Sequence, residues 1–179
     1  VEATTVNIGA GIGSGSGRIK LDLGSVQTTV NVFNSGNAAD RGIGAIILKG
    51  THASNALNVT KGDVDVAPFA GEAATLLTVN VGYLDNQTGD SDVYLGSGVT
   101  LTNATIKISG GRLETNSATS GTATITVSGG TVVLNSGGQV GLTVRGGEVQ
   151  YNSTGTLGGA PVVSNSGHLD FSRDLRSKG

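Results

Sequence analysis

Cysteine, methionine and tryptophan do not occur among the 179 residues, and proline occurs only as Pro68 and Pro161. The absence of cysteine excludes a small secreted domain stapled by disulfides. Aromatic residues make up only 3% of the chain, so its core has to be built from aliphatic side chains. With a hydrophobic fraction of 36%, arranged in short aliphatic runs, the chain is not a disordered low-complexity sequence.

Charged residues are also scarce, at 13% of the chain, and the net charge is −2. Binding to a phosphate backbone requires a concentrated lysine and arginine face, so we expect no nucleic-acid partner. No run approaches the roughly 18 apolar residues of a membrane-spanning helix, so we expect no membrane insertion. The first residues lack the positive and apolar regions of a secretory signal peptide, although a leader removed before Val1 fits the sequence equally well.

Glycine is in excess, with 31 occurrences, about 17% of the chain against roughly 7% in average usage. Between glycine, serine and asparagine, aliphatic residues alternate with polar ones in short runs, which is the pattern of half-buried β-strands. The clearest runs are 19–23, 30–32, 64–66, 77–81, 106–108, 125–127 and 142–144. Residues 38–47 come closest to a helical pattern, but Gly42 and Gly44 favour a loop there. We therefore expect an all-β protein.

One octapeptide, Gly-Gly-x-(Leu/Val)-x-x-Asn-Ser, occurs three times, at residues 110–117, 129–136 and 146–153. Its second glycine moves from 111 to 130 to 147, at intervals of 19 and 17 residues. A strand–turn–strand unit that returns at this interval is typical of a solenoid whose coils stack on one another. A weaker fourth copy spans 167–172, a degenerate earlier unit spans 59–64, and Gly62 and Gly82 lie one coil length apart.

Each part of the octapeptide has a structural task. The aliphatic pair before Gly-Gly is expected to point inward, and Gly-Gly turns the chain because glycine accepts a positive φ without a Cβ clash. The next aliphatic residue returns to the core, at Leu113, Val132 and Val149. Asn-Ser then closes the following corner, where asparagine tolerates left-handed backbone and both side chains can bond the nearby backbone. Coils stacked about 4.8 Å apart predict a hydrogen-bonded column of side-chain amides at Asn116, Asn135 and Asn152.

These features predict an all-β fold, a right-handed parallel β-helix (β-solenoid) of about eight rungs. A β-sandwich would have hairpin turns at about 8–12-residue spacing without a motif repeated in one phase. A left-handed helix would repeat hexapeptides over long stretches. Residues 1–17 are expected to form an N-terminal strand and a flexible Gly/Ser-rich arm, and residues 18–179 the solenoid domain.

The sequence assigns no catalytic, cofactor-binding or metal-binding residue. Asp63 and Asp65, and separately Asp90 and Asp92, form Asp-x-Asp pairs whose oxygens suit calcium. Solvated charges beside a glycine turn explain these pairs more simply, so we expect no metal and no cofactor.

An enzyme acting on polysaccharides would need clustered carboxylates together with a positioned cation. His52 and His168 are far apart, and each lacks an acidic neighbour at the repeat spacing. Arg112 and Arg145 lie on opposite sides of a glycine turn and do not stack, so we expect no enzyme.

Threonine also forms one alternating row, as on ice-binding solenoids, at Thr122, Thr124 and Thr126. No such row is evident on adjacent rungs, so we expect no flat threonine lattice.

The units Ile-x-Val-Ser-Gly-Gly-x-Val at 125–132 and Leu-x-Val-Arg-Gly-Gly-x-Val at 142–149 resemble right-handed β-solenoids of two groups. These are bacteriophage virion proteins and the passenger domains of bacterial autotransporters and filamentous adhesins. The resemblance covers residues 55–172, and the segment 167–176 is similar to one in phage and environmental solenoid proteins. It implies a parallel solenoid fold and carries no catalytic residues over to this chain.

Passenger domains run to many more rungs and precede a membrane barrel, so the length of this chain favours the first group. We therefore expect a non-catalytic structural protein of a virion surface, as a capsid decoration or tail component. The alternative is a cell-surface adhesin or autotransporter passenger fragment that binds a glycan or a host protein, and a polysaccharide lyase or hydrolase ranks third. Because open solenoid ends expose unpaired backbone, the expected partners are copies of the chain, for example in a trimer, and other virion structural proteins.

Overall fold

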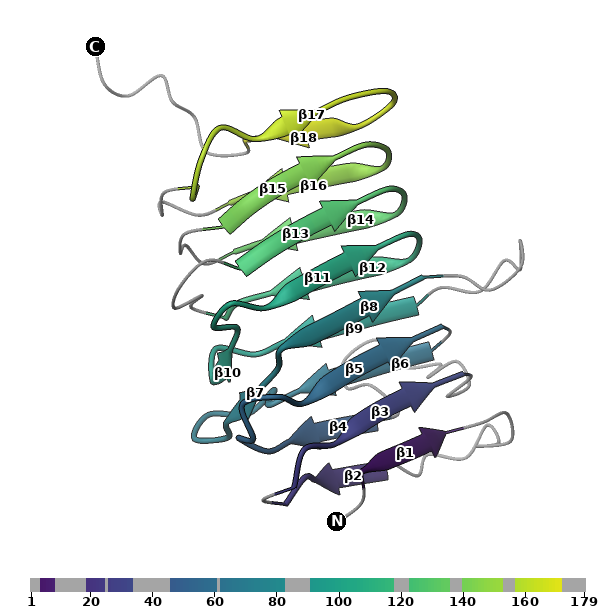
Figure 1. Cartoon of the computed structure of the whole chain (residues 1–179), viewed down its shortest axis with the longest axis vertical. Coiled ribbons are helices and arrows are strands. Elements are labelled where there is room, and N and C mark those ends of the chain that lie inside the picture. Colours follow the sequence, from purple (N-terminus) through teal and green to yellow (C-terminus); the bar gives the residue numbers. More distant parts are fainter. Residues whose placement is uncertain are drawn as a thin grey trace.

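The computed structural model describes residues 4–8, 19–24, 26–33, 46–60, 62–82, 91–117, 123–135, 140–152 and 157–171. These residues form eighteen β-strands and no helix. Along the chain, strands of two large sheets alternate, and successive coils stack along one axis from the N-terminus to the C-terminus (Figure 1).

Each of the two large sheets has eight strands. Sheet A contains, in spatial order, β1 (Thr5–Ile8), β3 (Thr29–Val32), β5 (Ala56–Val59), β8 (Thr78–Val81), β11 (Thr105–Ile108), β13 (Ala123–Val127), β15 (Val140–Val144) and β17 (Val162–Val163). Sheet B contains β2 (Ile19–Asp22), β4 (Ile46–Lys49), β6 (Gly62–Val66), β9 (Ser91–Leu95), β12 (Arg112–Thr115), β14 (Thr131–Leu134), β16 (Glu148–Tyr151) and β18 (His168–Asp170). A third, two-stranded sheet is formed by β7 (Ala74–Thr75) and β10 (Val99–Thr100).

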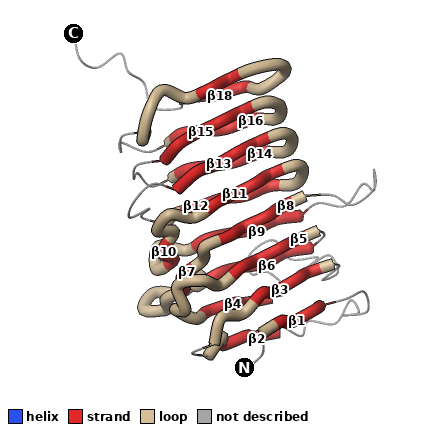
Figure 2. The backbone as a smooth tube through the Cα atoms, in the orientation of Figure 1, coloured by secondary structure: helices blue, strands red, loops and turns tan. Residues whose placement is uncertain are grey.

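All strand pairs in the described part of the chain are parallel and in register, so each strand lies over the equivalent strand of the previous coil. Figure 2 shows the strands as two stacked walls joined by loops at their edges. Side chains from both walls form one aliphatic core cluster between them. The expectation of an all-β fold with stacked parallel strands, the arrangement of a parallel β-solenoid, is confirmed.

The alternation of side chains along the strands explains this core. Register places one inward column of sheet A at Val30, Leu57, Val79, Ile106, Ile125 and Leu142, all at most 3% exposed. The matching column of sheet B contains Ile46, Val64, Val93, Leu113, Val132 and Val149. The inward role predicted for Leu113, Val132 and Val149 is therefore confirmed.

Two expectations about strand limits need correction. The alternation of the run 77–81 predicts that the Leu77 side chain points into the core. Leu77 is exposed instead, because the strand begins at Thr78, and the buried leucine is its neighbour Leu76. Ile46 and Ile47, placed in a loop, belong to β4 and are buried, since the loop-favouring glycines precede them. The rest of that proposed loop, residues 38–45, lies outside the described residues.

The N-terminal strand expected within residues 1–8 is present as β1, which pairs in register with β3 and so extends sheet A. The Gly/Ser-rich arm proposed after it lies outside the described residues.

The glycine pairs turn the chain as predicted, with the positive φ at the second glycine. The φ values are 71° at Gly111, 77° at Gly130 and 73° at Gly147. These glycines also stack closely, because a Cβ on Gly130 would lie 2.4 Å from the carbonyl oxygen of Gly111, and one on Gly147 2.4 Å from that of Gly130. Glycine is needed here for its backbone conformation and for the contact between coils.

The corner after β12 follows the prediction in part. Among described residues other than glycine, positive φ occurs only at Ala67, Asn103 and Asn165, so the left-handed backbone expected at Asn116 is absent. As expected, the serine side chain bonds to backbone, since the Ser117 hydroxyl donates to the Val99 carbonyl at 2.6 Å, and the Ser117 N–H donates to Thr115 Oγ1 at 3.0 Å.

The proposed equivalence of Gly62 and Gly82 is wrong. Gly62 begins β6 in sheet B and pairs with Ser91, whereas Gly82 follows β8 in sheet A and its N–H donates to the Val59 carbonyl. The two glycines lie on different sides of the coil, because the coil between them carries the additional strand β7 and is longer than those of the C-terminal repeats.

Gly130→Ala and Gly71→Ala separate the two roles of glycine. Gly71 has a φ of 84° with nothing within 4 Å of an added Cβ, so we expect only the conformational cost of about 1 kcal/mol. Gly130→Ala adds a clash with the Gly111 carbonyl, so we expect it to cost about 1–3 kcal/mol more. Urea denaturation measures both, and equal losses in the two variants would contradict the contact between coils.

Candidate functional site

The outer face of sheet A carries two columns of short side chains. Register aligns the first at Thr5, Thr29, Ala56, Thr78, Thr105, Thr124 and Gly141. It aligns the second at Asn7, Asn31, Asn58, Asn80, Lys107, Thr126 and Thr143. No acidic residue occurs in any described strand of this sheet. The face is therefore polar, and Lys107 is its only charged side chain within these strands.

The Thr-x-Thr row of β13 is not repeated on the adjacent rungs, as expected, because its positions are taken by Thr105 and Lys107 in β11 and by Gly141 and Thr143 in β15. A single threonine column does form, since Thr124 lies over Thr105, and Thr105 over Thr78. Ala56 interrupts it, and Thr122 of the proposed row lies outside the described residues. The sequence does not reveal this column readily. Thr78, Thr105 and Thr124 each begin a short alternating run, but the residue two places later is asparagine, lysine or threonine, so the runs look different.

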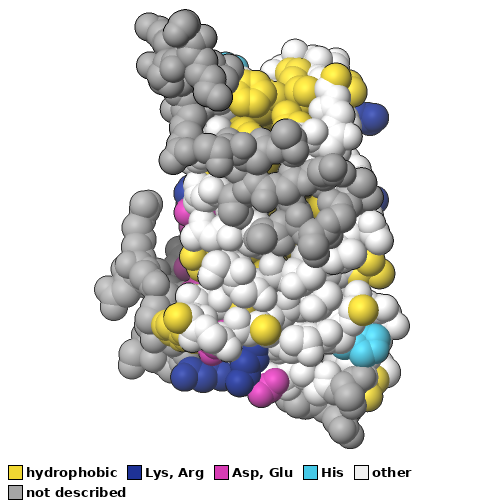
Figure 3. Space-filling model, turned by 90° about the vertical axis from the view of Figure 1, so that its left-hand side faces the viewer, with side chains coloured by type: hydrophobic (Ala, Val, Ile, Leu, Met, Phe, Trp, Pro, Cys, Tyr) yellow, Lys and Arg dark blue, Asp and Glu magenta, His cyan; other side chains and the backbone are white. Residues whose placement is uncertain are grey.

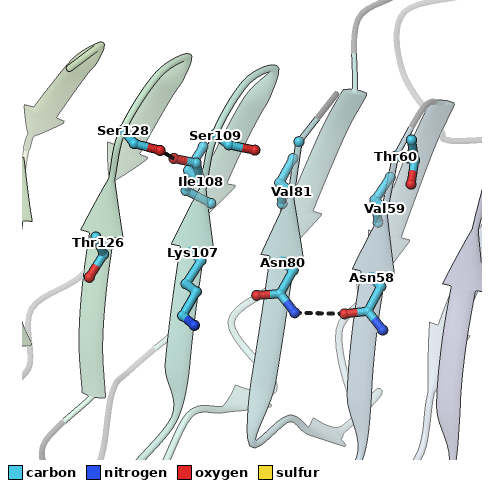
Figure 4. Close-up of a pocket in the computed structure, with 11 residues that line it drawn as sticks. Asn58, Val59, Thr60, Asn80, Val81, Lys107, Ile108, Ser109, Thr126 and Ser128 are labelled. Carbon is cyan, nitrogen blue, oxygen red and sulfur yellow. Dashed lines mark hydrogen bonds between the residues drawn. The ribbon is translucent and has the colours of Figure 1, made fainter. Parts of the chain in front are cut away.

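Four asparagines of the second column form a ladder of side-chain hydrogen bonds. Asn31 Nδ2 donates to Asn7 Oδ1 at 2.8 Å, and Asn58 Nδ2 donates to Asn31 Oδ1 at 2.7 Å. Asn80 Nδ2 donates to Asn58 Oδ1 at 2.7 Å, as the dashed line in Figure 4 shows. Asn31 and Asn58 thus each donate to one coil and accept from another, and the ladder links consecutive coils outside the core.

The amide column predicted in the octapeptides is only partly formed. Asn152 Nδ2 donates to Asn135 Oδ1 at 2.9 Å, as expected. Asn135 donates instead to Glu114 Oε1 at 2.9 Å, and Asn116 donates to the Tyr94 hydroxyl at 2.8 Å. The inclusion of Asn116 is therefore wrong, because a carboxylate is a stronger acceptor than an amide and competes for the Asn135 donor.

A groove of about 390 Å³ crosses the outer face of β5, β8, β11 and β13 (Figure 4). Its polar side chains come from the strands and the residues that follow them: Asn58, Thr60, Asn80, Lys107, Ser109, Thr126 and Ser128. Lys107 extends between the asparagine ladder on one side and Thr126 on the other. The amides, hydroxyls and one ammonium group of this set can hydrogen-bond to a ligand, and the rest of the lining is formed by Val59, Val81, Gly82 and Ile108.

Sheet B carries most of the outward charges. Asp63 lies in register with Asp92, and Asp92 with Arg112, while Asp65 lies in register with Tyr94 and Tyr94 with Glu114. The Arg112 guanidinium donates to Glu114 on the same strand. Asp90, the fourth member of the Asp-x-Asp pairs, lies outside the described residues. Within the described chain, no three histidine, aspartate or glutamate side chains converge in a way that could hold a metal ion.

The basic residues considered for catalysis are separate from one another. Arg112 belongs to β12 of sheet B, whereas Arg145 follows β15 of sheet A, so they do not stack, as expected. His52 accepts a hydrogen bond from the Ser54 N–H at Nδ1. The statement that His168 lacks an acidic neighbour is wrong, because His168 pairs in register with Glu148. The Glu148 carboxylate accepts a hydrogen bond from Gln150 at 2.8 Å.

Asn58→Ala removes two hydrogen bonds of the asparagine ladder, whereas Asn7→Ala removes one. A neutral hydrogen bond contributes about 0.5–1.5 kcal/mol to stability, and less where it is exposed. We therefore expect the free energy of unfolding to fall by about 1–2 kcal/mol in Asn58→Ala and by about 0.5 kcal/mol in Asn7→Ala. The free energy of unfolding from urea titration measures both. Asn58→Thr, which installs the residue found at Thr126 in the same column, is the matched control and should cost less than Asn58→Ala. Equal stability of all three variants would show that the ladder does not stabilise the coils.

Comparisons with protein families, curated proteins and solved structures find no match to this chain. In the part of the chain that the structure describes, no helix has the length and apolarity needed to cross a membrane. What the molecule does is therefore inferred from its architecture and its outer faces.

Proposed function

We propose that this protein is a non-catalytic structural solenoid that acts as a rigid rod in a surface assembly. The asparagine ladder is the observation that carries the proposal. On the outer face of sheet A, three consecutive side-chain hydrogen bonds of 2.7–2.8 Å join coil to coil. Since a solenoid is stabilised by contacts between neighbouring repeats, this face and the core act together to stiffen the rod.

The proposal includes a right-handed coil of about eight rungs. It is supported by two eight-stranded sheets whose strands alternate along the chain. A connection between parallel strands of one sheet is right-handed in the great majority of proteins, because of the twist of the strands. The 19- and 17-residue intervals between glycine corners fit this coil better than a hexapeptide repeat does.

We place the rod on a virion surface, as a capsid decoration or tail component. The support is the resemblance of residues 125–132 and 142–149 to phage solenoids. An antibody raised against the recombinant chain should label density-gradient-purified virus particles from the source material. Label confined to the bacterial envelope fraction would instead assign the chain to the adhesin class.

Assembly through the solenoid end is supported by the last described coil. Val163 continues the inward column above Val144, but Val163 is 45% exposed whereas Val144 is fully buried. Val162 and Phe171 are 57% and 45% exposed, and hydrophobic side chains gather at this end of the molecule (Figure 3). An apolar core column that reaches the surface is stabilised when another molecule covers it, so we propose that copies of the chain associate here.

Analytical ultracentrifugation tests this association. We expect the sedimentation coefficient of the native chain to increase with concentration, and the double variant Val162→Thr with Val163→Thr to remain monomeric, because threonine retains strand propensity while removing apolar surface. Phe69→Ser, which removes an exposed hydrophobic side chain elsewhere, is the control and should associate like the native chain. A native chain that stays monomeric over the whole concentration range contradicts association through this end.

A further inference from the structure

We propose that the groove on sheet A binds an acidic saccharide, with one sugar carboxylate over Lys107. This inference does not depend on the location of the rod on a virion. It rests on the charge at the centre of the groove, the hydrogen-bonding groups around it and the spacing of the strands beneath it.

The Lys107 ammonium group has no anionic partner in the described chain. The ion pairs there are Lys49 with Asp22 and Arg112 with Glu114, all on sheet B. The neighbours of Lys107 in register are Asn80 and Thr126, which are uncharged. An exposed cation among described strands that carry no carboxylate attracts an anionic group from solution, and lysine presents three N–H donors to it.

The groups beside Lys107 suit the hydroxyl and amide substituents of a sugar. Thr126, Ser109 and Ser128 supply hydroxyls that both donate and accept hydrogen bonds. In the ladder, the Asn80 amide uses one N–H, and the Asn58 amide uses one N–H and its carbonyl oxygen, which leaves a second N–H on each amide and the Asn80 carbonyl oxygen for a ligand. A volume of about 390 Å³ lies in the range of ligand pockets, about 300–1,000 Å³.

The groove runs across strands, from Asn58 through Asn80 and Lys107 to Thr126. Neighbouring strands are about 4.8 Å apart, which is close to the length of one pyranose unit in an extended polysaccharide. A chain laid across the strands therefore places about one sugar over each coil. With a single cation, the site accommodates a saccharide in which an acidic unit alternates with neutral units, rather than a polymer charged at every unit.

Titration of the ¹⁵N-labelled protein with two tetrasaccharides tests the proposal. The acidic probe is the hyaluronan tetrasaccharide, which alternates glucuronate and N-acetylglucosamine, and the neutral probe is the tetramer of N-acetylglucosamine. We expect saturable amide shifts at Lys107 and Thr126 with the acidic probe, and binding of the neutral probe about five-fold weaker, the ratio given by one exposed ion pair. Raising the salt concentration should reduce this ratio.

Lys107→Gln should lower the affinity for the acidic probe to that for the neutral probe. Lys20→Gln removes an equal charge from the outer face of sheet B and should leave the affinity unchanged. Thermal unfolding of both variants verifies that the fold is retained. Absence of binding by the native chain, equal affinity for the two probes, or equal effects of the two lysine substitutions would each overturn the proposal.

Discussion

In-register parallel stacking is the constraint on which the rest of this structure depends. Each side chain lies about 4.8 Å from the equivalent side chain of the next coil. The side chains of one column therefore have to pack against one another, or bond to one another, at this distance. Inward columns satisfy this with valine, isoleucine and leucine, and the corner column satisfies it with glycine. Outward columns of sheet A satisfy it with threonine and with asparagine, whose side-chain amides hydrogen-bond to one another. Like charges on adjacent strands repel, which favours few charges, and on sheet B Asp63 and Asp92 are an in-register pair of like charge.

The sequence predicted the fold class well where the coils have a constant length. The three octapeptides differ in spacing by only two residues, and the structure places their glycines at positive φ and their aliphatic residues in the core. The asparagine ladder escaped detection because its members are separated by 24, 27 and 22 residues. A search for a constant period does not find such a column, although the recurring Thr-Val-Asn-Val at 29–32 and 78–81 marks two of its rungs.

The groove could not be predicted for a different reason. It forms where four strands lie side by side, and those strands are separated by loops of different length. Lys107 alone resembles any surface lysine, and only the register shows that its neighbours are an asparagine and a threonine. The same limitation hid the pairing of His168 with Glu148 and the competition of Glu114 for the Asn135 amide. In each case, the register determined which partners met.

The corners of this solenoid permit insertions without altering its pitch. Val132 and Val149 are paired across an interval of 17 residues, whereas Gly62 and Ser91 are paired across 29, and both pairs are parallel and in register. In the described part of the longer coil, the corner between β6 and β8 carries the additional strand β7. Evolution can therefore lengthen a surface loop, or a designer can graft a peptide epitope there, while the distance between neighbouring rungs stays fixed by backbone hydrogen bonds. A rod of this kind presents inserted segments at regular heights along its axis.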